Sequence, residues 1–140
     1  WGRAGLRLGV AYASPEIIGY YNKVKYPYNV NAVTQEMAIK ALDELDTVKQ
    51  WVDELLESRT ALADEFKSIN CVKHIYPSDA NFLLIKVDNP DELYTYLCEN
   101  GIIVRNRNHV EKCAGCLRIT IGTKEENAQL LNAIKDYDRK

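Results

Sequence analysis

The C-terminal half of the chain switches from a purely helical pattern of apolar residues to a mixed one, and this switch restricts the possible folds more than any other feature. Four short apolar or alternating runs are typical of strands: residues 71–76, 81–87, 102–105 and 117–121. Helical spacing of apolar residues recurs at 91–99 and 124–138. The order strand–strand–helix–strand–strand–helix predicts an α+β fold, with a small, mostly antiparallel sheet and helices on one face.

A long helical pattern precedes this region. It begins near Asp46, ends near Asn70, and places apolar residues on one continuous face. Further upstream, residues 6–13 (LRLGVAYA) have the apolar content of a buried strand. Ser14 and Pro15 then predict the start of a helix over 16–25. Another helix follows, capped by Asn29 or Asn31.

Composition excludes several classes of function. The formal net charge is −2, so the chain has no basic field that would attract nucleic acid. No apolar run approaches the roughly 20 residues that a membrane span needs, and the first residues do not have the pattern of a signal peptide. The four cysteines are expected to be reduced thiols, as in a cytoplasmic protein.

Two arginines stand on the strands near the end of the chain. Arg105 closes one apolar run, and Arg118 lies inside LRITI. Strand alternation turns Arg118 away from the apolar side chains beside it. The planar fork of an arginine held on a strand suits a carboxylate or phosphate in bidentate geometry. The alternative is that these are ordinary solvent-facing arginines on an edge strand.

Three motifs carry a resemblance to a known family. They are GRAGLRLG at residues 2–9, IVR at 103–105 and GCLRITIG at 115–122. In this order and spacing they resemble the fold-type-I pyridoxal-phosphate aminotransferases, most closely the histidinol-phosphate aminotransferase family. The resemblance covers the whole chain. One departure is Arg3, which stands where the family has an apolar residue.

The resemblance implies roles for four residues. Arg7 would bind the phosphate of the cofactor, pyridoxal 5'-phosphate, and Arg118 would bind the anionic group of the substrate. Arg105 would add a second positive charge at that anion, and Asn81 would lie on the substrate side of the small domain. The alternative is that Asn81 is a turn residue that starts a strand. The implied reaction moves an amino group between histidinol phosphate and 2-oxoglutarate or glutamate, in histidine biosynthesis.

The resemblance also implies how the chain divides. Residues 1–28 would be a remnant of the large cofactor-binding domain, and residues 29–140 the linking helix and the C-terminal small domain. The Schiff-base lysine is expected just before Trp1, so no catalytic residue is expected within the chain, which should be inactive alone. The family resemblance implies a cytoplasmic homodimer whose partners are a small-molecule amino donor and acceptor.

Two other interpretations stay open at this point. The first is another fold-type-I aminotransferase or an amino-acid-phosphate decarboxylase. The second is a metal- or thiol-dependent regulatory domain that uses the CxxC pair Cys113 and Cys116, with His109 four residues before it. Zinc commonly needs four ligands, and a redox CxxC usually opens a helix, whereas Cys116 leads into a strand. We therefore expect no metal ligand here and a structural or incidental role for both cysteines.

Overall fold

The structure, a computed structural model, describes residues 1–139. The chain packs as two compact units, Trp1–Trp51 and Val52–Lys140. The helices of the described chain are α1 (Pro15–Val24), α2 (Ala32–Leu42), α3 (Leu45–Phe66), α4 (Pro90–Glu99) and α5 (Lys124–Asp138), preceded by the short 3-10 helix η1 (Ala4–Leu6). Helix α3 runs through the division between the two units.

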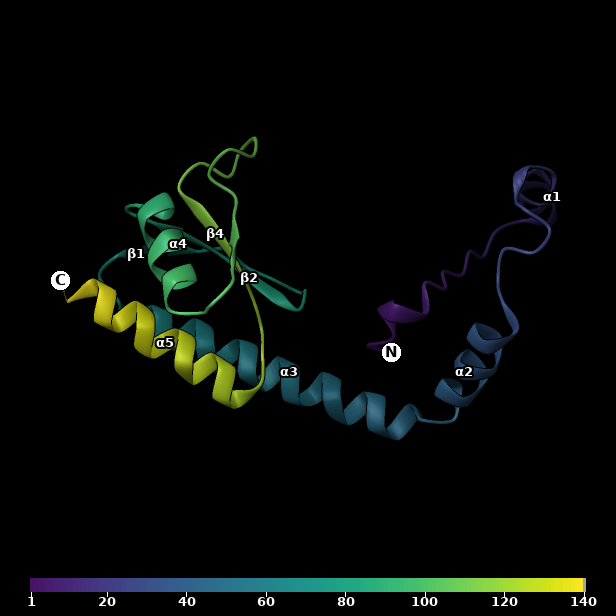
Figure 1. The fold of residues 1–140 in the computed structure, drawn as a ribbon, viewed down its shortest axis with the longest axis horizontal. Helices are drawn as coiled ribbons and strands as arrows, with labels where there is room; N and C mark the ends of the chain where they lie inside the picture. Colours follow the sequence, from purple (N-terminus) through teal and green to yellow (C-terminus); the bar gives the residue numbers. More distant parts are fainter. Residues whose placement is uncertain (140) are drawn as a thin grey trace. The chain divides into compact units, whose positions relative to one another are not determined.

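The C-terminal unit is built on one four-stranded sheet (Figure 1). Its strands are β1 (Val72–Ile75), β2 (Phe82–Val87), β3 (Arg105–Asn106) and β4 (Cys116–Thr120). They lie in the order β1-β2-β4-β3, and every neighbouring pair is antiparallel. This topology confirms the predicted α+β fold with a small antiparallel sheet.

Successive residues of β2 and β4 alternate between a buried face and a more exposed face of this sheet. Leu83 and Ile85 of β2, and Leu117 and Ile119 of β4, are at most 3% exposed, whereas Arg118 between them is half-buried. The buried face packs against helices α3, α4 and α5 (Figure 1). These helices supply large core side chains: Leu62, Phe66, Leu93, Leu97, Leu130 and Ile134. The sheet therefore has one helix-covered face, as predicted, and the polar positions of β4 lie on the other face.

Helix α5 is fixed at both ends by side chains. At its start, Thr123 and Glu126 form a capping box, in which each side chain accepts a hydrogen bond from the other residue's backbone N–H. At its end, the Asp138 carboxylate accepts hydrogen bonds from the backbone N–H groups of Asn70 and Cys71. The predicted helix at 124–138 is confirmed, and Thr123 is its N-cap residue.

Two predicted boundaries differ from the structure. The run 102–105 is not a full strand, because the Ile102 N–H still bonds the Leu97 carbonyl at the end of α4; β3 begins only at Arg105. The long helix ends at Phe66 rather than near Asn70. The N–H groups of residues 67–69 bond carbonyls three residues back, which tightens the chain into a closing turn.

The N-terminal unit confirms its two predicted helices and corrects one strand. Helix α2 begins after Asn31, whose side chain accepts the Thr34 N–H at 2.8 Å. The prediction of a buried strand over residues 6–13 is wrong: residues 7–13 are exposed and have no regular structure. A strand needs a hydrogen-bonded neighbour, and the described residues of this unit contain no other strand.

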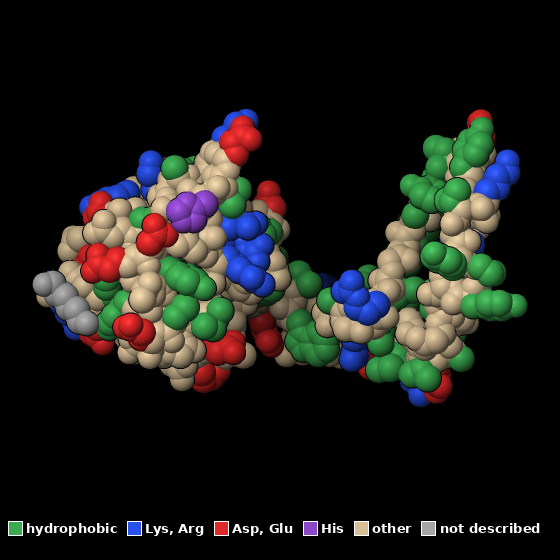
Figure 2. Space-filling model, turned by 45° about the horizontal axis from the view of Figure 1, so that its top comes forward, with side chains coloured by type: hydrophobic (Ala, Val, Ile, Leu, Met, Phe, Trp, Pro, Cys, Tyr) green, Lys and Arg blue, Asp and Glu red, His purple; other side chains and the backbone are tan. Residues whose placement is uncertain are grey.

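Many apolar side chains of the N-terminal unit are exposed (Figure 2). Tyr12, Tyr26 and Tyr28 are each more than 80% exposed, and Ala41 is the only residue of helices α1 and α2 that is buried. Such a surface is typical of a segment that packs against further protein. The predicted boundary between residues 28 and 29 concerns the domains of a longer enzyme and stays a prediction. Among the described helices, none is long and apolar enough to cross a membrane.

Candidate anion-binding site

Arg105 and Arg118 lie directly opposite each other on neighbouring strands. Antiparallel pairing of β3 with β4 puts these two residues in register. Directly opposed residues project to the same face, with Cβ atoms about 4.5–5.5 Å apart. The structure therefore brings together the two arginines that the sequence placed on separate strands.

Arg118 is held in place by packing more than by hydrogen bonds. Its guanidinium carbon lies 5.1 Å from the centre of the Phe82 ring, a cation–π contact across the sheet. Leu84 lies opposite it on β2. Its Nε atom is buried and has no hydrogen-bond partner within the described chain. A buried N–H donor without a partner is costly, so this atom is available to an acceptor from outside the described chain.

Arg105 is exposed and lies near the Tyr94 phenol of α4. A hydrogen bond with Cys98 raises the pKa of Tyr94, and the positive charge of Arg105 opposes this rise. Within residues 1–139, no carboxylate forms an ion pair with Arg105 or Arg118. Two like charges directly opposite each other destabilise a sheet unless an anion compensates them. The pair therefore has the charge and geometry of a site for a carboxylate or a phosphate.

Asn81 lies one residue before β2, next to the Phe82 that packs on Arg118. Its backbone carbonyl accepts the Ile121 N–H at 3.0 Å, and its side chain is exposed. The preceding turn is tied to α3 by Arg59, whose Nη1 donates to the Ala80 carbonyl at 2.7 Å. Asn81 is thus held at the end of β2 by its backbone, and the role of its amide in binding stays a prediction.

Arg7 belongs to the N-terminal unit and follows η1 with a left-handed backbone, φ 54°. The turn before it is tied to α2, because the Trp1 indole donates to the Ala41 carbonyl at 2.8 Å and Arg3 pairs with Glu44. Arg3, the departure from the family pattern, thus has a structural partner. The Arg7 side chain is exposed, and its guanidinium makes no hydrogen bond or ion pair within the described chain. Its place in a cofactor site stays a prediction.

The CxxC pair lies in the turn that leads into β4. The Cys116 N–H bonds the Cys113 carbonyl at 3.0 Å, and both thiols are free. Burial raises the pKa of Cys116, although a hydrogen bond with Tyr76 works in the opposite direction. A neutral thiol is a poor nucleophile and a poor metal ligand. Residues 1–139 contain no group of three or more potential ligands that could hold a metal ion.

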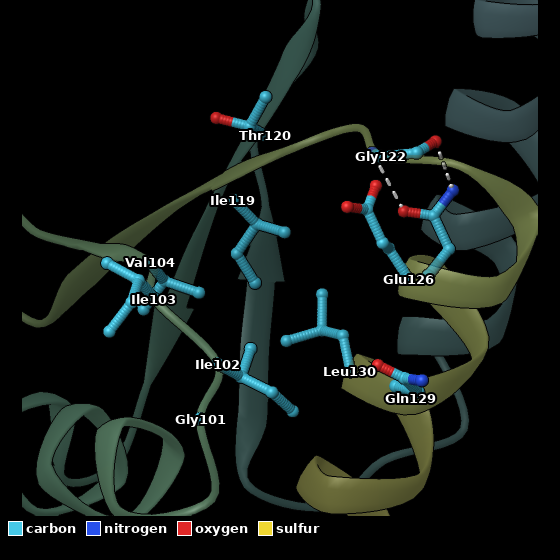
Figure 3. A pocket seen from close by; sticks show the side chains of 11 residues that line it. Gly101, Ile102, Ile103, Val104, Ile119, Thr120, Gly122, Glu126, Gln129 and Leu130 are labelled. Atoms are coloured by element: carbon cyan, nitrogen blue, oxygen red, sulfur yellow. Dashed lines mark hydrogen bonds between the residues drawn. The ribbon is translucent and has the colours of Figure 1, made fainter.

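A separate cavity of about 350 Å³ opens between the chain before β3 and the start of α5 (Figure 3). Ile102, Val104, Ile119 and Leu130 form its apolar wall. Glu126 lies at its edge, but the carboxylate already accepts the Thr123 N–H at 2.8 Å. The two arginines do not line this cavity. Its wall is continuous with the hydrophobic core, so we assign the chemistry to the arginine pair and not to the cavity.

Comparison with known proteins decides the family. The sequence matches the aminotransferases of class I and II over residues 1–134. The chain belongs to this family of aminotransferases. A histidinol-phosphate aminotransferase of Parabacteroides distasonis is 54% identical over 97% of the chain, and one of Christiangramia forsetii is 51% identical over 99%. The chain spans 39% of the length of each of these aminotransferases.

Solved structures agree on the fold. The histidinol-phosphate aminotransferase of Clostridium acetobutylicum is 22% identical and superimposes with a TM-score of 0.82, over 89% of this chain and 38% of that one. A decarboxylase of Sulfurospirillum multivorans is 26% identical with a TM-score of 0.83, over 97% of this chain and 40% of that one. The small sheet with helices on one face is therefore common to aminotransferases and this decarboxylase.

Sequence reasoning missed two features of the site. The contact between Phe82 and Arg118 depends on the register of β2 against β4, which the sequence does not fix. The other feature is a carboxylate, Asp91, that ties α4 to the loop after β3. The polar run RNRNH at residues 105–109 indicated an ordered loop, but it did not identify the residue that holds the loop. That residue, Asp91, lies 15 residues before Asn106 and 17 residues before Asn108.

Proposed function

We propose that the protein to which this chain belongs is a pyridoxal-phosphate-dependent aminotransferase that acts on histidinol phosphate and 2-oxoglutarate or glutamate, in histidine biosynthesis. The observation that carries the proposal is that Arg105 and Arg118 are directly opposed and have no ion-pair partner within the described residues, in a chain of the aminotransferase family. High identity to histidinol-phosphate aminotransferases over nearly the whole chain supports this substrate.

One feature of the chain supports binding of the cofactor. Arg7 carries an exposed guanidinium without a partner in the described chain, at the end of a turn that is fastened to α2. Such a fork neutralises a phosphate and orients it through two parallel hydrogen bonds. When bound, pyridoxal phosphate acts as an electron sink for negative charge that develops on the amino acid. In this proposal, Arg7 holds the cofactor by its phosphate.

The arginine pair would bind the substrate anion and orient the substrate for the reaction. Arg118 is fixed by β4 and by the Phe82 ring before a substrate arrives, so little entropy is lost in aligning it. A phosphate carries more negative charge than a carboxylate and is better neutralised by two cations than by one. Arg105, exposed and directly opposite, would supply the second cation. The same pair would accept the carboxylate of glutamate in the other half-reaction.

A second candidate is decarboxylation of a phosphorylated amino acid. The solved decarboxylase that superimposes over nearly the whole chain favours it, because its small domain has the same fold. An arginine pair binds a phosphorylated amino acid as well as it binds histidinol phosphate. Identity to the histidinol-phosphate aminotransferases is about twice that to the decarboxylase, which is why transamination is our first proposal.

The proposed enzyme is a cytoplasmic homodimer, with a small-molecule amino donor and acceptor as its partners. The exposed apolar side chains of the N-terminal unit support an assembly larger than this chain, because such a surface is typical of one that other protein covers.

The test is a substrate panel on the full-length protein loaded with pyridoxal phosphate. We expect 2-oxoglutarate to be converted to glutamate with histidinol phosphate as the donor, and the cofactor to be retained. Release of carbon dioxide from a phosphorylated amino acid, without glutamate formation, would establish the decarboxylase instead. An Arg7→Ala variant should bind pyridoxal phosphate about ten- to a hundredfold more weakly, measured by absorbance titration.

A further inference from the structure

The loop after Arg105 is organised by one carboxylate from another element. Strand β3 is only two residues long, so the sheet itself holds Arg105 by few hydrogen bonds. Asp91, in the first turn of α4, accepts the Asn106 side-chain amide through Oδ1 at 2.6 Å. Its other oxygen, Oδ2, accepts the Asn108 amide at 2.9 Å. Both oxygens of Asp91 thus bind the segment that immediately follows Arg105.

The side chains of Asn106 and Asn108 also accept hydrogen bonds from the backbone, so they connect Asp91 to the main chain of the loop. Asn106 Oδ1 accepts the Asn108 N–H at 2.9 Å, and Asn108 Oδ1 accepts the Gly115 N–H at 2.9 Å. Gly115 lies just before β4, and its carbonyl accepts the Val87 N–H of β2. The chain of hydrogen bonds therefore runs from α4 through the loop to the sheet, and each asparagine uses both ends of its amide.

Asp91 does this without pairing with the arginines. Within the described chain, its ion-pair contact is with His109, whose Nε2 lies 4.0 Å from Oδ1. An acidic residue that neutralised Arg105 would compete with the substrate anion. The Asp91 carboxylate instead accepts hydrogen bonds from the side-chain amides of Asn106 and Asn108. An amide donates a stronger hydrogen bond to an ionised acceptor than to a neutral one.

We propose that Asp91 is a positioning residue for Arg105, and that it sets the preference of the anion site for a phosphorylated substrate. The role rests on the proposed function, because it requires Arg105 to bind that phosphate. Asp91 acts through Asn106 and Asn108 on the backbone that carries Arg105, and it does not touch the substrate.

The experiment uses the full-length enzyme and the variants Asp91→Ala, Asn108→Ala and Arg105→Ala, with Glu92→Gln as the matched control. Glu92 lies in the same first turn of α4 and hydrogen-bonds Tyr137, whereas the loop amides bond Asp91, so its change removes an equal charge and leaves the loop's hydrogen bonds in place. The network is exposed to solvent, so its loss should be modest: Asp91→Ala should raise KM for histidinol phosphate about three- to tenfold. kcat, and KM for 2-oxoglutarate, should stay within about twofold, and Asn108→Ala should resemble Asp91→Ala.

Two further readouts separate positioning from general stability. In the Arg105→Ala background, Asp91→Ala should have no additional effect on KM, because the residue that it positions is gone. Backbone hydrogen exchange at residues 106–115 should be faster in Asp91→Ala than in Glu92→Gln. An equal loss in both backgrounds, an unchanged loop, or Asp91→Ala kinetics equal to those of Glu92→Gln would overturn the positioning role while leaving the proposed function intact. If Arg105→Ala itself left KM for histidinol phosphate unchanged, Arg105 would not bind the phosphate and the positioning role of Asp91 would fall with it, whereas the substrate panel would still decide the proposed function.

Discussion

Asp138 is the clearest single contributor to the stability of the C-terminal unit. Its carboxylate accepts three hydrogen bonds from the chain before β1: the Asn70 N–H at 2.9 Å, the Asn70 side-chain amide at 3.1 Å and the Cys71 N–H at 2.6 Å. Replacing Asp138 by Ala leaves the Cys71 N–H without this acceptor at a buried position. Hydrogen bonds to a charged group contribute about 1.5–3 kcal/mol, so we expect the free energy of unfolding to fall by about that amount.

The pH dependence of this effect follows from the pKa of Asp138. Desolvation raises that pKa, but the hydrogen bonds from Asn70 and Cys71 together outweigh it and hold the pKa below 3.8. A carboxyl group with a lowered pKa in the folded state stabilises the fold above its unfolded pKa. This stabilisation is lost as the pH falls through the lower, folded value. The difference between wild type and Asp138→Asn should therefore be constant from pH 7 to about 5 and should shrink below about pH 4.

The assay is urea unfolding of the 140-residue chain, followed by circular dichroism at several pH values. Asp136→Asn is the control, because Asp136 lies on the same helix, is exposed, and among the described residues has its ion pair with Arg139, at 3.4 Å. We expect the control to change the free energy of unfolding by less than about 0.5 kcal/mol. An Asp138→Ala effect as small as the control, or a difference that grows as the pH falls, would refute this reasoning.

The other predictions concern the cap of α5 and the CxxC pair. Thr123→Ala should lower the free energy of unfolding by about 1 kcal/mol, since it removes one half of the capping box; urea unfolding would show no change if the cap were irrelevant. Cys116→Ser should cost about 1–2 kcal/mol, because it puts a hydroxyl at a fully buried position, whereas Cys113→Ser at a half-buried one should cost less than about 0.5 kcal/mol. Neither change should alter metal content, and stoichiometric zinc in the purified, reduced wild type would restore the metal interpretation.

Most strands and helices of the C-terminal unit were predictable because they have a complete local signal. Thr123, with glutamates in the first turn after it, marks the start of α5, and the alternation of LRITI separates Arg118 from the core. These signals depend on neighbours within a few residues. The order of elements then limits the sheet to few arrangements, and the observed antiparallel order β1-β2-β4-β3 is one of them.

The predictions failed where the outcome depends on distant parts of the chain. The run at residues 6–13 has the apolar content of a strand, but pairing requires a neighbouring strand that residues 1–51 do not provide. The run at 102–105 is shortened because Ile102 still closes the end of α4. In the candidate site, the family resemblance implied that Arg105 and Arg118 bind one anion, but their direct opposition was not predicted, since register is a property of the pair of strands.

The most direct test of the central claim is kcat/KM of the full-length enzyme for histidinol phosphate and for glutamate, in Arg118→Ala, Arg118→Lys and Arg105→Ala. We predict that Arg118→Ala lowers kcat/KM about tenfold to a few hundredfold for both substrates, because the bound anion loses a charge-assisted contact. Arg118→Lys keeps the charge but loses the planar fork, so its loss should be intermediate. Arg105→Ala should affect histidinol phosphate more than glutamate. Small and equal losses in all three variants, for both substrates, would contradict the claim that this opposed arginine pair binds the substrate anion.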